Sequence, residues 1–193
     1  MKNKKLQVGY TLIELLTVMI ILVTVGTIII SILVSSLRSG NKSATTNDIR
    51  QNGSNAIAQV SKMITYAYSF DGVNDGNAWY TDCLSSTLGA VNKFYSVRIS
   101  SFDEDQNGNH LQTTFNCSDM VLSSQSASMT TPLVNPDTSA TCWFTCSQNS
   151  LVTPPTIGID LTLQKKATGT LLPESQAVIH FQTSVTMRNN NLQ

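Results

Sequence analysis

The sequence predicts an α+β fold in which a long N-terminal helix, transmembrane in its first half, packs with its second half on an antiparallel β-sheet. Three observations support this prediction. An uncharged apolar run lies near the N-terminus, helical spacing of apolar residues follows it to about residue 70, and spacing of two replaces it beyond that point. No proline precedes Pro132, so nothing obliges a helix from about residue 10 to about residue 70 to break.

The uncharged run covers residues 15–37 and is 23 residues long. As a helix it spans about 34 Å, which is enough to cross a bilayer core of about 30 Å. Three lysines lie within the first five residues, and polar sequence follows the run. We therefore expect a single-pass membrane protein with its N-terminus in the cytoplasm. A cleaved secretory signal and a plain signal anchor are the alternatives, although a signal h-region is usually only about 7 to 15 residues long.

Glu14 places a single carboxylate at the start of this run. A carboxylate inside hydrocarbon costs several kcal/mol unless it is neutralised or paired, so it indicates a partner. The alternative is an interfacial acid at a helix N-terminus, where the helix dipole favours negative charge.

The hexapeptide GYTLIE, which begins at Gly9 and ends at Glu14, follows a short basic leader and precedes the apolar run. It resembles the processing motif of type IV prepilins and type II secretion pseudopilins. The resemblance implies cleavage between Gly9 and Tyr10 by a membrane aspartyl peptidase, followed by N-methylation of Tyr10. The family usually has Phe at that position, so Tyr10 is a departure from its pattern. The implied organisation is a leader over residues 1–9, a transmembrane and filament-core helix over residues 10–37, and an extracytoplasmic domain over residues 38–193.

Cleavage at Gly9 would create an α-amine four residues before Glu14. In a bundle of such helices, the amine of one subunit could meet Glu14 of its neighbour, so that the pair forms only on assembly. Glu14 is therefore predicted to be an assembly residue. The resemblance implies three kinds of partner: other pilin or pseudopilin subunits through their N-terminal helices, the prepilin peptidase, and the inner-membrane assembly platform.

The helix over residues 50–62 is similar to that of PilW-type minor pilins and J-type minor pseudopilins. Major pilins usually carry a proline within the apolar helix, and none is present here. The expected function is a minor subunit of a type IV pilus or type II secretion-like pseudopilus, in its initiation or tip complex, which becomes part of a cell-surface filament. Two alternatives stay open: a filament-tip module that binds surfaces, DNA or a secreted substrate, and an uncleaved signal-anchored surface protein.

Beyond the apolar run, one helix face carries small and apolar residues at steps of three and four. They are Ile49, Gly53, Ala56, Ile57, Val60, Ile64, Ala67 and Tyr68. Alternating residues then predict strands over residues 95–99, 111–117, 157–163 and 179–187. Turns are predicted over residues 71–76 and 103–109, and a Ser-, Thr- and Pro-rich surface loop over residues 123–140.

The cysteines number four, all downstream of the apolar run. In an exported domain an even number predicts two disulfides, and three connectivities are possible. The alternatives are free thiols and a four-thiolate zinc site, although a zinc site would normally use pairs of C-x-x-C, which are absent. The disulfide candidates are Cys83, Cys117, Cys142 and Cys146.

The sequence gives little indication of catalysis or a cofactor. Asp103, Asp105 and Asn107 match the first half of a calcium loop, but Thr114 stands where a bidentate Glu is needed, so a solvated hairpin tip is favoured over a calcium turn. Neither histidine, His110 nor His180, lies near a nucleophile motif, and we expect no enzyme activity. Basic and acidic residues balance at 12 each, so no charge excess indicates nucleic-acid binding.

Two aromatic pairs, Trp79 with Tyr80 and Trp143 with Phe144, could form an exposed adhesive patch. Large aromatic residues more often belong to the core, so a core position is favoured for them.

Overall fold

The computed structural model describes residues 11–118, 121–126, 129–166 and 177–188, and it divides into two compact units, Met1–Asn41 and Lys42–Gln193. The helix α1, Leu12–Thr65, contributes to both units. Gly40, where the sequence permits a bend, is helical. In the second unit α1 packs on antiparallel sheets, which confirms the predicted α+β fold.

The helix α1 ends at Thr65, before the predicted limit near residue 70. The N–H of Ala67 donates to the Ile64 carbonyl, and the N–H of Tyr68 then donates to the carbonyl of Ser100 at 2.8 Å. The chain therefore leaves the helix because sheet pairing begins at Tyr68, although Ala67 is buried as its spacing predicts.

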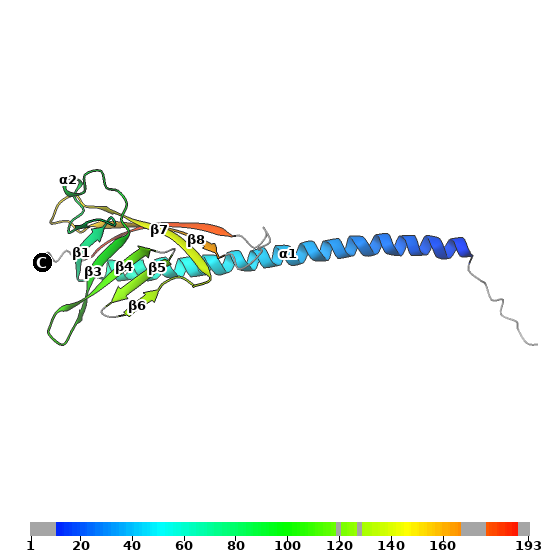
Figure 1. Ribbon diagram of the computed structural model, residues 1–193, viewed down its shortest axis with the longest axis horizontal. Coiled ribbons are helices and arrows are strands. Elements are labelled where there is room, and N and C mark those ends of the chain that lie inside the picture. The colour runs from blue at the N-terminus through cyan, green and yellow to red at the C-terminus, as the bar shows by residue number, and fades with distance from the viewer. Residues whose placement is uncertain (1–10, 119–120, 127–128, 167–176, 189–193) are drawn as a thin grey trace, which may run out of the picture. The chain divides into compact units, whose positions relative to one another are not determined.

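Six antiparallel strands form the larger sheet in the order β2-β1-β3-β4-β5-β6. Figure 1 labels the strands of this sheet from β1 to β6, except β2. Their bounds are β1 Ser69–Asn74, β2 Trp79–Tyr80, β3 Ser96–Glu104, β4 His110–Ser118, β5 Val121–Ser126 and β6 Met129–Pro132. The smaller sheet has the order β7-β8-β9. Its strands are β7 Thr138–Ser147, β8 Thr156–Lys165 and β9 Val178–Thr186, and a one-turn helix, α2 Ser85–Leu88, precedes β3.

All four segments predicted as strands are confirmed, as β3, β4, β8 and β9. The loop predicted over residues 123–140 is wrong in part, because it contains the end of β5, all of β6 and the start of β7. The turn predicted over residues 71–76 is also misplaced. Gly72 lies in β1 beside a register shift, with φ of 136°, and the chain turns at Asp75, whose carboxylate accepts the N–H groups of Asn77 and Ala78.

The predicted helix face forms one side of the core. Ile49, Gly53, Ala56, Val60 and Ile64 are the buried residues of α1. The inward faces of both sheets cover them, and three phenylalanines, Phe94, Phe115 and Phe144, are fully buried among these residues. The periodicity of the sequence was therefore sufficient to identify the helix face that packs on the sheets.

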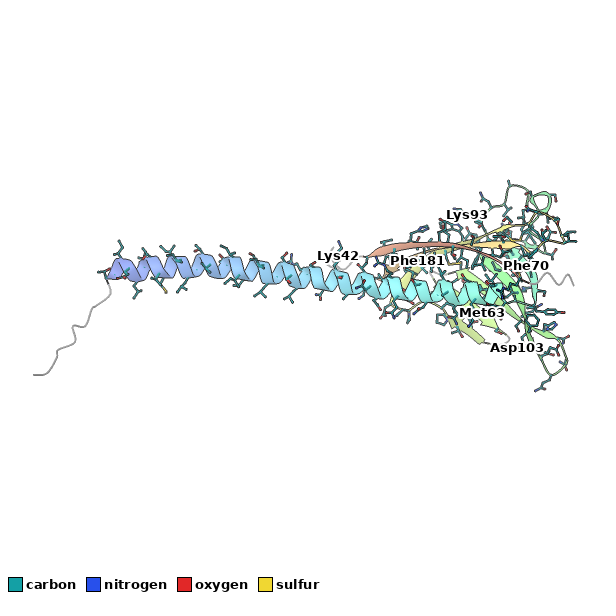
Figure 2. The ribbon with its side chains drawn as sticks, turned by 180° about the vertical axis from the view of Figure 1, so that it is seen from behind. Lys42, Met63, Phe70, Lys93, Asp103 and Phe181 are labelled. Carbon is teal, nitrogen blue, oxygen red and sulfur yellow. A yellow bond between two sulfur atoms is a disulfide. The ribbon has the colours of Figure 1, made fainter. Side chains whose placement is uncertain are left out.

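Gly53 lets strand β9 approach the helix closely. A Cβ at this position would lie 2.9 Å from Cδ2 of Phe181 and closer still to Cε2 and Cζ of the same ring. Figure 2 labels Phe181 beside α1 in the second unit. The packing of β9 on α1 therefore depends on the absence of a side chain at residue 53.

Both disulfides join β7 to other parts of the second unit. Cys142 is bonded to Cys117 of β4, which links the two sheets, and Cys146 is bonded to Cys83, which precedes α2. The structure thus selects one of the three connectivities that the sequence left open. The spacing of four between Cys142 and Cys146 places both on the inward face of β7, on either side of the buried Phe144.

Candidate functional site

The first unit presents an apolar helical surface. The large apolar side chains between Leu12 and Val34 are all exposed, by fractions from 84% at Leu12 to 42% at Val34. Figure 2 shows side chains on all sides of this part of α1. Its length and composition are sufficient to cross a membrane once, and none of its most apolar stretch is buried within the structure.

Hydroxyl groups within this apolar helix bond to the helix itself. Thr17, Thr24, Thr27 and Ser31 each donate to the carbonyl three residues earlier, at 2.7 to 2.9 Å. A hydroxyl that is already bonded in this way lowers the cost of placing its side chain in hydrocarbon. These residues therefore suit a lipid environment and need no partner helix.

Glu14 lies in the first turn of α1 and is exposed. Its N–H donates to the carbonyl of Thr11 at 3.1 Å and lies 3.4 Å from the Thr11 hydroxyl. The spacing Thr-x-x-Glu is that of a capping box, which our sequence analysis missed. In a capping box the Glu side chain would accept the Thr11 N–H, but among the described residues the Glu14 carboxylate has no hydrogen bond or ion pair.

The predicted processing residues, Gly9 and Tyr10, lie outside the described residues. The described residues begin at Thr11, the second residue after the predicted cut, so the geometry around the new N-terminus stays a prediction.

The calcium candidates lie at the hairpin between β3 and β4. One oxygen of Asp105, Oδ1, accepts the N–H of Asn107 at 2.8 Å and the N–H of Asn109 at 2.9 Å. These bonds lower the pKa of the Asp105 carboxyl below its ordinary value, and the bond from Asn109 has the larger effect. Asp105 thus organises a tight turn, with Gly108 at φ of 79°. Within the described ranges, no group of three or more His, Cys, Asp or Glu is arranged to hold a metal ion.

The two histidines lie on different sheets. His180 projects from the outer face of β9, where Nε2 lies 2.9 Å from Oδ1 of Asp160 on β8. His110 stacks on Tyr68 with 3.7 Å between ring centroids. Nδ1 of His110 is buried and has no hydrogen-bond partner among the described residues. The expectation of no enzyme activity stays a prediction.

The aromatic residues divide between core and surface. Phe144 is fully buried, which confirms the core position favoured for it from the sequence, and Tyr80 is partly buried against the core. Trp79 is 41% exposed, and the guanidinium carbon of Arg98 lies 3.9 Å from its ring centroid. Trp143 is half-buried on the outer face of β7, with Nζ of Lys93 4.3 Å from its ring centroid.

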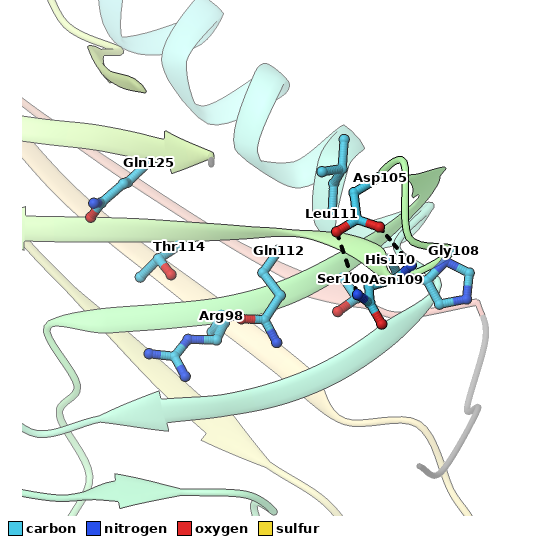
Figure 3. A pocket seen from close by; sticks show the side chains of 10 residues that line it. All are labelled: Arg98, Ser100, Asp105, Gly108, Asn109, His110, Leu111, Gln112, Thr114 and Gln125. Carbon is cyan, nitrogen blue, oxygen red and sulfur yellow. Dashed lines mark hydrogen bonds between the residues drawn. The ribbon is translucent and has the colours of Figure 1, made fainter. Parts of the chain in front are cut away.

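A polar hollow of about 940 Å³ lies on the larger sheet, on the face opposite α1. Arg98 and Ser100 of β3, Gln112 and Thr114 of β4, and Gln125 of β5 contribute to its lining. Figure 3 shows Arg98, Gln112 and Thr114 together on this part of the sheet. This face was not predicted from the sequence, although its residues on β3 and β4 alternate with the apolar residues that identified those two strands.

Comparisons with protein-family models, with curated proteins and with solved structures found no match for this chain.

Proposed function

We propose that this chain is a minor pilin or pseudopilin subunit. In this proposal the prepilin peptidase cleaves it between Gly9 and Tyr10, the apolar part of α1 holds it in the inner membrane, and the assembly platform adds it to a type IV pilus or type II secretion-like pseudopilus. Its place is the initiation or tip complex, where its N-terminal helix packs against those of other pilin-like subunits.

Glu14 is the observation that carries the proposal. Its carboxylate stands in the first turn of an apolar helix, five residues after Gly9, and has no partner among the described residues. An unpaired carboxylate at the edge of hydrocarbon is unfavourable, so a helix that retains it is expected to pair it in another state. The α-amine created by cleavage supplies a cation of opposite charge at the start of the same helix.

The apolar surface of the first unit supports the same proposal. Every large apolar side chain of this surface is exposed, so it needs lipid in the membrane and neighbouring helices after extraction from it. The bonded hydroxyl groups of Thr17 and Thr24 suit both environments. Lipid covers these apolar side chains before assembly, and the helices of neighbouring subunits cover them afterwards.

The disulfides support an extracytoplasmic location for the second unit. All four cysteines are paired, in two bonds that tie β7 to its neighbours. Disulfides form and persist in oxidising compartments and are rare in the cytosol. This supports the orientation that we propose, in which the second unit lies beyond the membrane and the N-terminus lies on the cytoplasmic side.

Substitution of Glu14 tests the proposal. In native cells Glu14→Gln should leave the amount of membrane-inserted protein unchanged and lower its incorporation into sheared filaments or pseudopili by about tenfold, the effect of losing one partly buried ion pair. Thr17→Val, one turn further along the same helix, is the matched control and should incorporate normally. Normal incorporation of the Gln variant would contradict the assembly role of Glu14.

A further inference from the structure

The face of the larger sheet that is turned away from α1 consists mainly of neutral hydrogen-bonding side chains. They come from alternate positions of three neighbouring strands: Ser96, Arg98 and Ser100 of β3, Gln112, Thr114 and Asn116 of β4, and Ser123 and Gln125 of β5. The strand register places Arg98 opposite Thr114, and Thr114 opposite Gln125, so these three form one row across the strands. Gln112 belongs to the next row, opposite Ser100.

Arg98 is the cation of this face. Its guanidinium stacks on Trp79 at 3.9 Å and, within the described part of the chain, has no hydrogen bond or ion pair. Asp71 precedes Gly72, the cross-strand neighbour of Arg98, but forms no ion pair with Arg98. Its two oxygens instead accept the hydroxyl groups of Ser69 and Ser100, at 2.9 and 2.7 Å. Stacking holds the guanidinium plane while its N–H donors stay free, a geometry suited to a carboxylate.

The neutral groups beside Arg98 are also free. The side chains of Gln112, Thr114 and Gln125 make no hydrogen bonds to other described residues. Side chains directly opposite each other on neighbouring strands have Cβ atoms about 4.5–5.5 Å apart, so the row spans a distance comparable to one or two sugar rings. Each amide offers two donors and an acceptor, and the hydroxyl offers both, which matches the alternating donors and acceptors of sugar hydroxyl groups.

We propose that this polar hollow is a binding site for an acidic glycan. Arg98 pairs with the carboxylate of one sugar, and Gln112, Thr114 and Gln125 bind the hydroxyl groups of the adjoining rings. Asp105 also lines the hollow, where its carboxylate accepts the N–H groups of Asn107 and Asn109, and Asp71 accepts the hydroxyl of Ser100. Among the described residues, Arg98 is the one Lys or Arg of the lining, which fits a ligand with one carboxylate per recognised unit. Nucleic acid is less suited, because its affinity depends on several Lys or Arg contacts with phosphates. A peptide is less suited because a peptide site usually has apolar pockets for anchoring side chains. The site belongs to the second unit alone and does not depend on filament assembly.

Binding of defined oligosaccharides to the full chain in detergent micelles tests the site by calorimetry. The probes are tetragalacturonate, 3′-sialyllactose and the methyl ester of tetragalacturonate, which keeps the hydroxyl groups and removes the charge. We expect at least one acidic probe to bind, and Arg98→Gln to weaken that binding by about tenfold or more, as the loss of a bidentate charge-assisted pair predicts. The methyl ester should bind more weakly than its acid and should be insensitive to this substitution.

Two further variants separate recognition from folding. Gln125→Ala removes one exposed amide without touching the Arg98–Trp79 stack and should weaken binding by about threefold to tenfold, the loss of one or two neutral hydrogen bonds. Lys93→Gln removes the cation over Trp143, on the other sheet, and is the matched control for loss of a cation above an indole ring. It should bind as the unmodified chain does.

Three results would overturn the inference. The first is that neither acidic probe binds at about 10 mM, a concentration that detects even weak sites. The second is that Arg98→Gln, with an unchanged thermal unfolding midpoint, binds the acidic probes as tightly as the unmodified chain. The third is that a short DNA duplex or an acidic peptide of equal charge binds at the hollow more tightly than either sugar, which would assign the face to another class of ligand.

Discussion

Replacing Gly53 with Ala should destabilise the second unit, although the same change at an exposed helix position is stabilising. Alanine has a helix propensity about 1 kcal/mol more favourable than glycine. The added Cβ, however, would lie 2.9 Å from Cδ2 of Phe181 and closer to two other ring atoms. Because carbon atoms in contact normally lie about 3.5–4.0 Å apart, the ring or the strand that carries it must move.

Overpacking of this kind costs about 1–3 kcal/mol. After subtraction of the propensity gain, we expect Gly53→Ala to lower the free energy of unfolding by about 1 kcal/mol. Ser54→Ala, at the exposed neighbouring position, is the matched control and should raise it by a few tenths of a kcal/mol.

Urea unfolding of the full chain in detergent micelles, followed by tryptophan fluorescence, measures the effect. Both tryptophans, Trp79 and Trp143, lie in the second unit and therefore report on its unfolding. Phe181→Leu should cost less in the Gly53→Ala background than in the unmodified chain, with a coupling of about 1 kcal/mol, because the smaller side chain relieves the overlap. An increase in stability of about 1 kcal/mol for Gly53→Ala alone would refute the close approach of Phe181 to the helix.

Two further predictions concern the disulfide between the sheets and the turn between β3 and β4. Replacing both Cys117 and Cys142 with Ser, which opens a sequence separation of 25 residues, should lower the free energy of unfolding by about 2–4 kcal/mol; thermal unfolding followed by circular dichroism measures this, and an unchanged midpoint would contradict it. The pKa of Asp105 is lowered in the folded chain because the N–H groups of Asn109 and Asn107 donate to its carboxylate. Its contribution is therefore present above its ordinary value of 3.8 and is lost as the pH falls through the lower folded value. Hydrogen exchange at both amides, corrected for intrinsic rates, should lose protection in that range, and Asp105→Asn should remove this pH dependence; equal pH dependence in the variant would contradict the assignment.

The helix and four of the strands were predictable because their burial has a regular period. Ile49, Val60 and Ile64 recur at helical spacing, and buried apolar residues occupy every second position from Ile157 to Leu163. Each pattern therefore indicates which face of the element is buried. The end of α1 was less predictable, because Ala67 continues the helical spacing while the backbone at Tyr68 has already begun to pair with β3. The spacing of apolar residues does not show where backbone groups begin to pair with a strand.

The strands β5 and β6 could not be found in this way. Serines dominate β5, and Ser124 faces the same side as the buried Leu122, so its apolar alternation is broken. β5 pairs with the edge of β4, and β6 pairs in turn with β5. Strand formation here depends on these partners, which the local composition of the two segments does not reveal. The disulfide connectivity depends on the same tertiary arrangement.

The candidate sites also differ in whether a local sequence pattern reveals them. Glu14 was identifiable from the sequence alone, because the acid and the uncharged run that follows it are adjacent in the sequence. The row of Arg98, Thr114 and Gln125 was not, because its members come from three strands and become neighbours only through the strand register. The position of the Arg98 guanidinium over Trp79 is likewise a property of the fold, since Trp79 lies on β2 and Arg98 on β3.

The proposed function requires that the N-terminal segment is cut before the chain is assembled. Mass spectrometry of the N-terminal peptide, from membranes and filaments of native cells, detects this cut. We expect a peptide that begins with N-methylated Tyr10, with residues 1–9 absent. Recovery of intact residues 1–9 on the membrane-resident protein, without the processed form in any fraction, would contradict it.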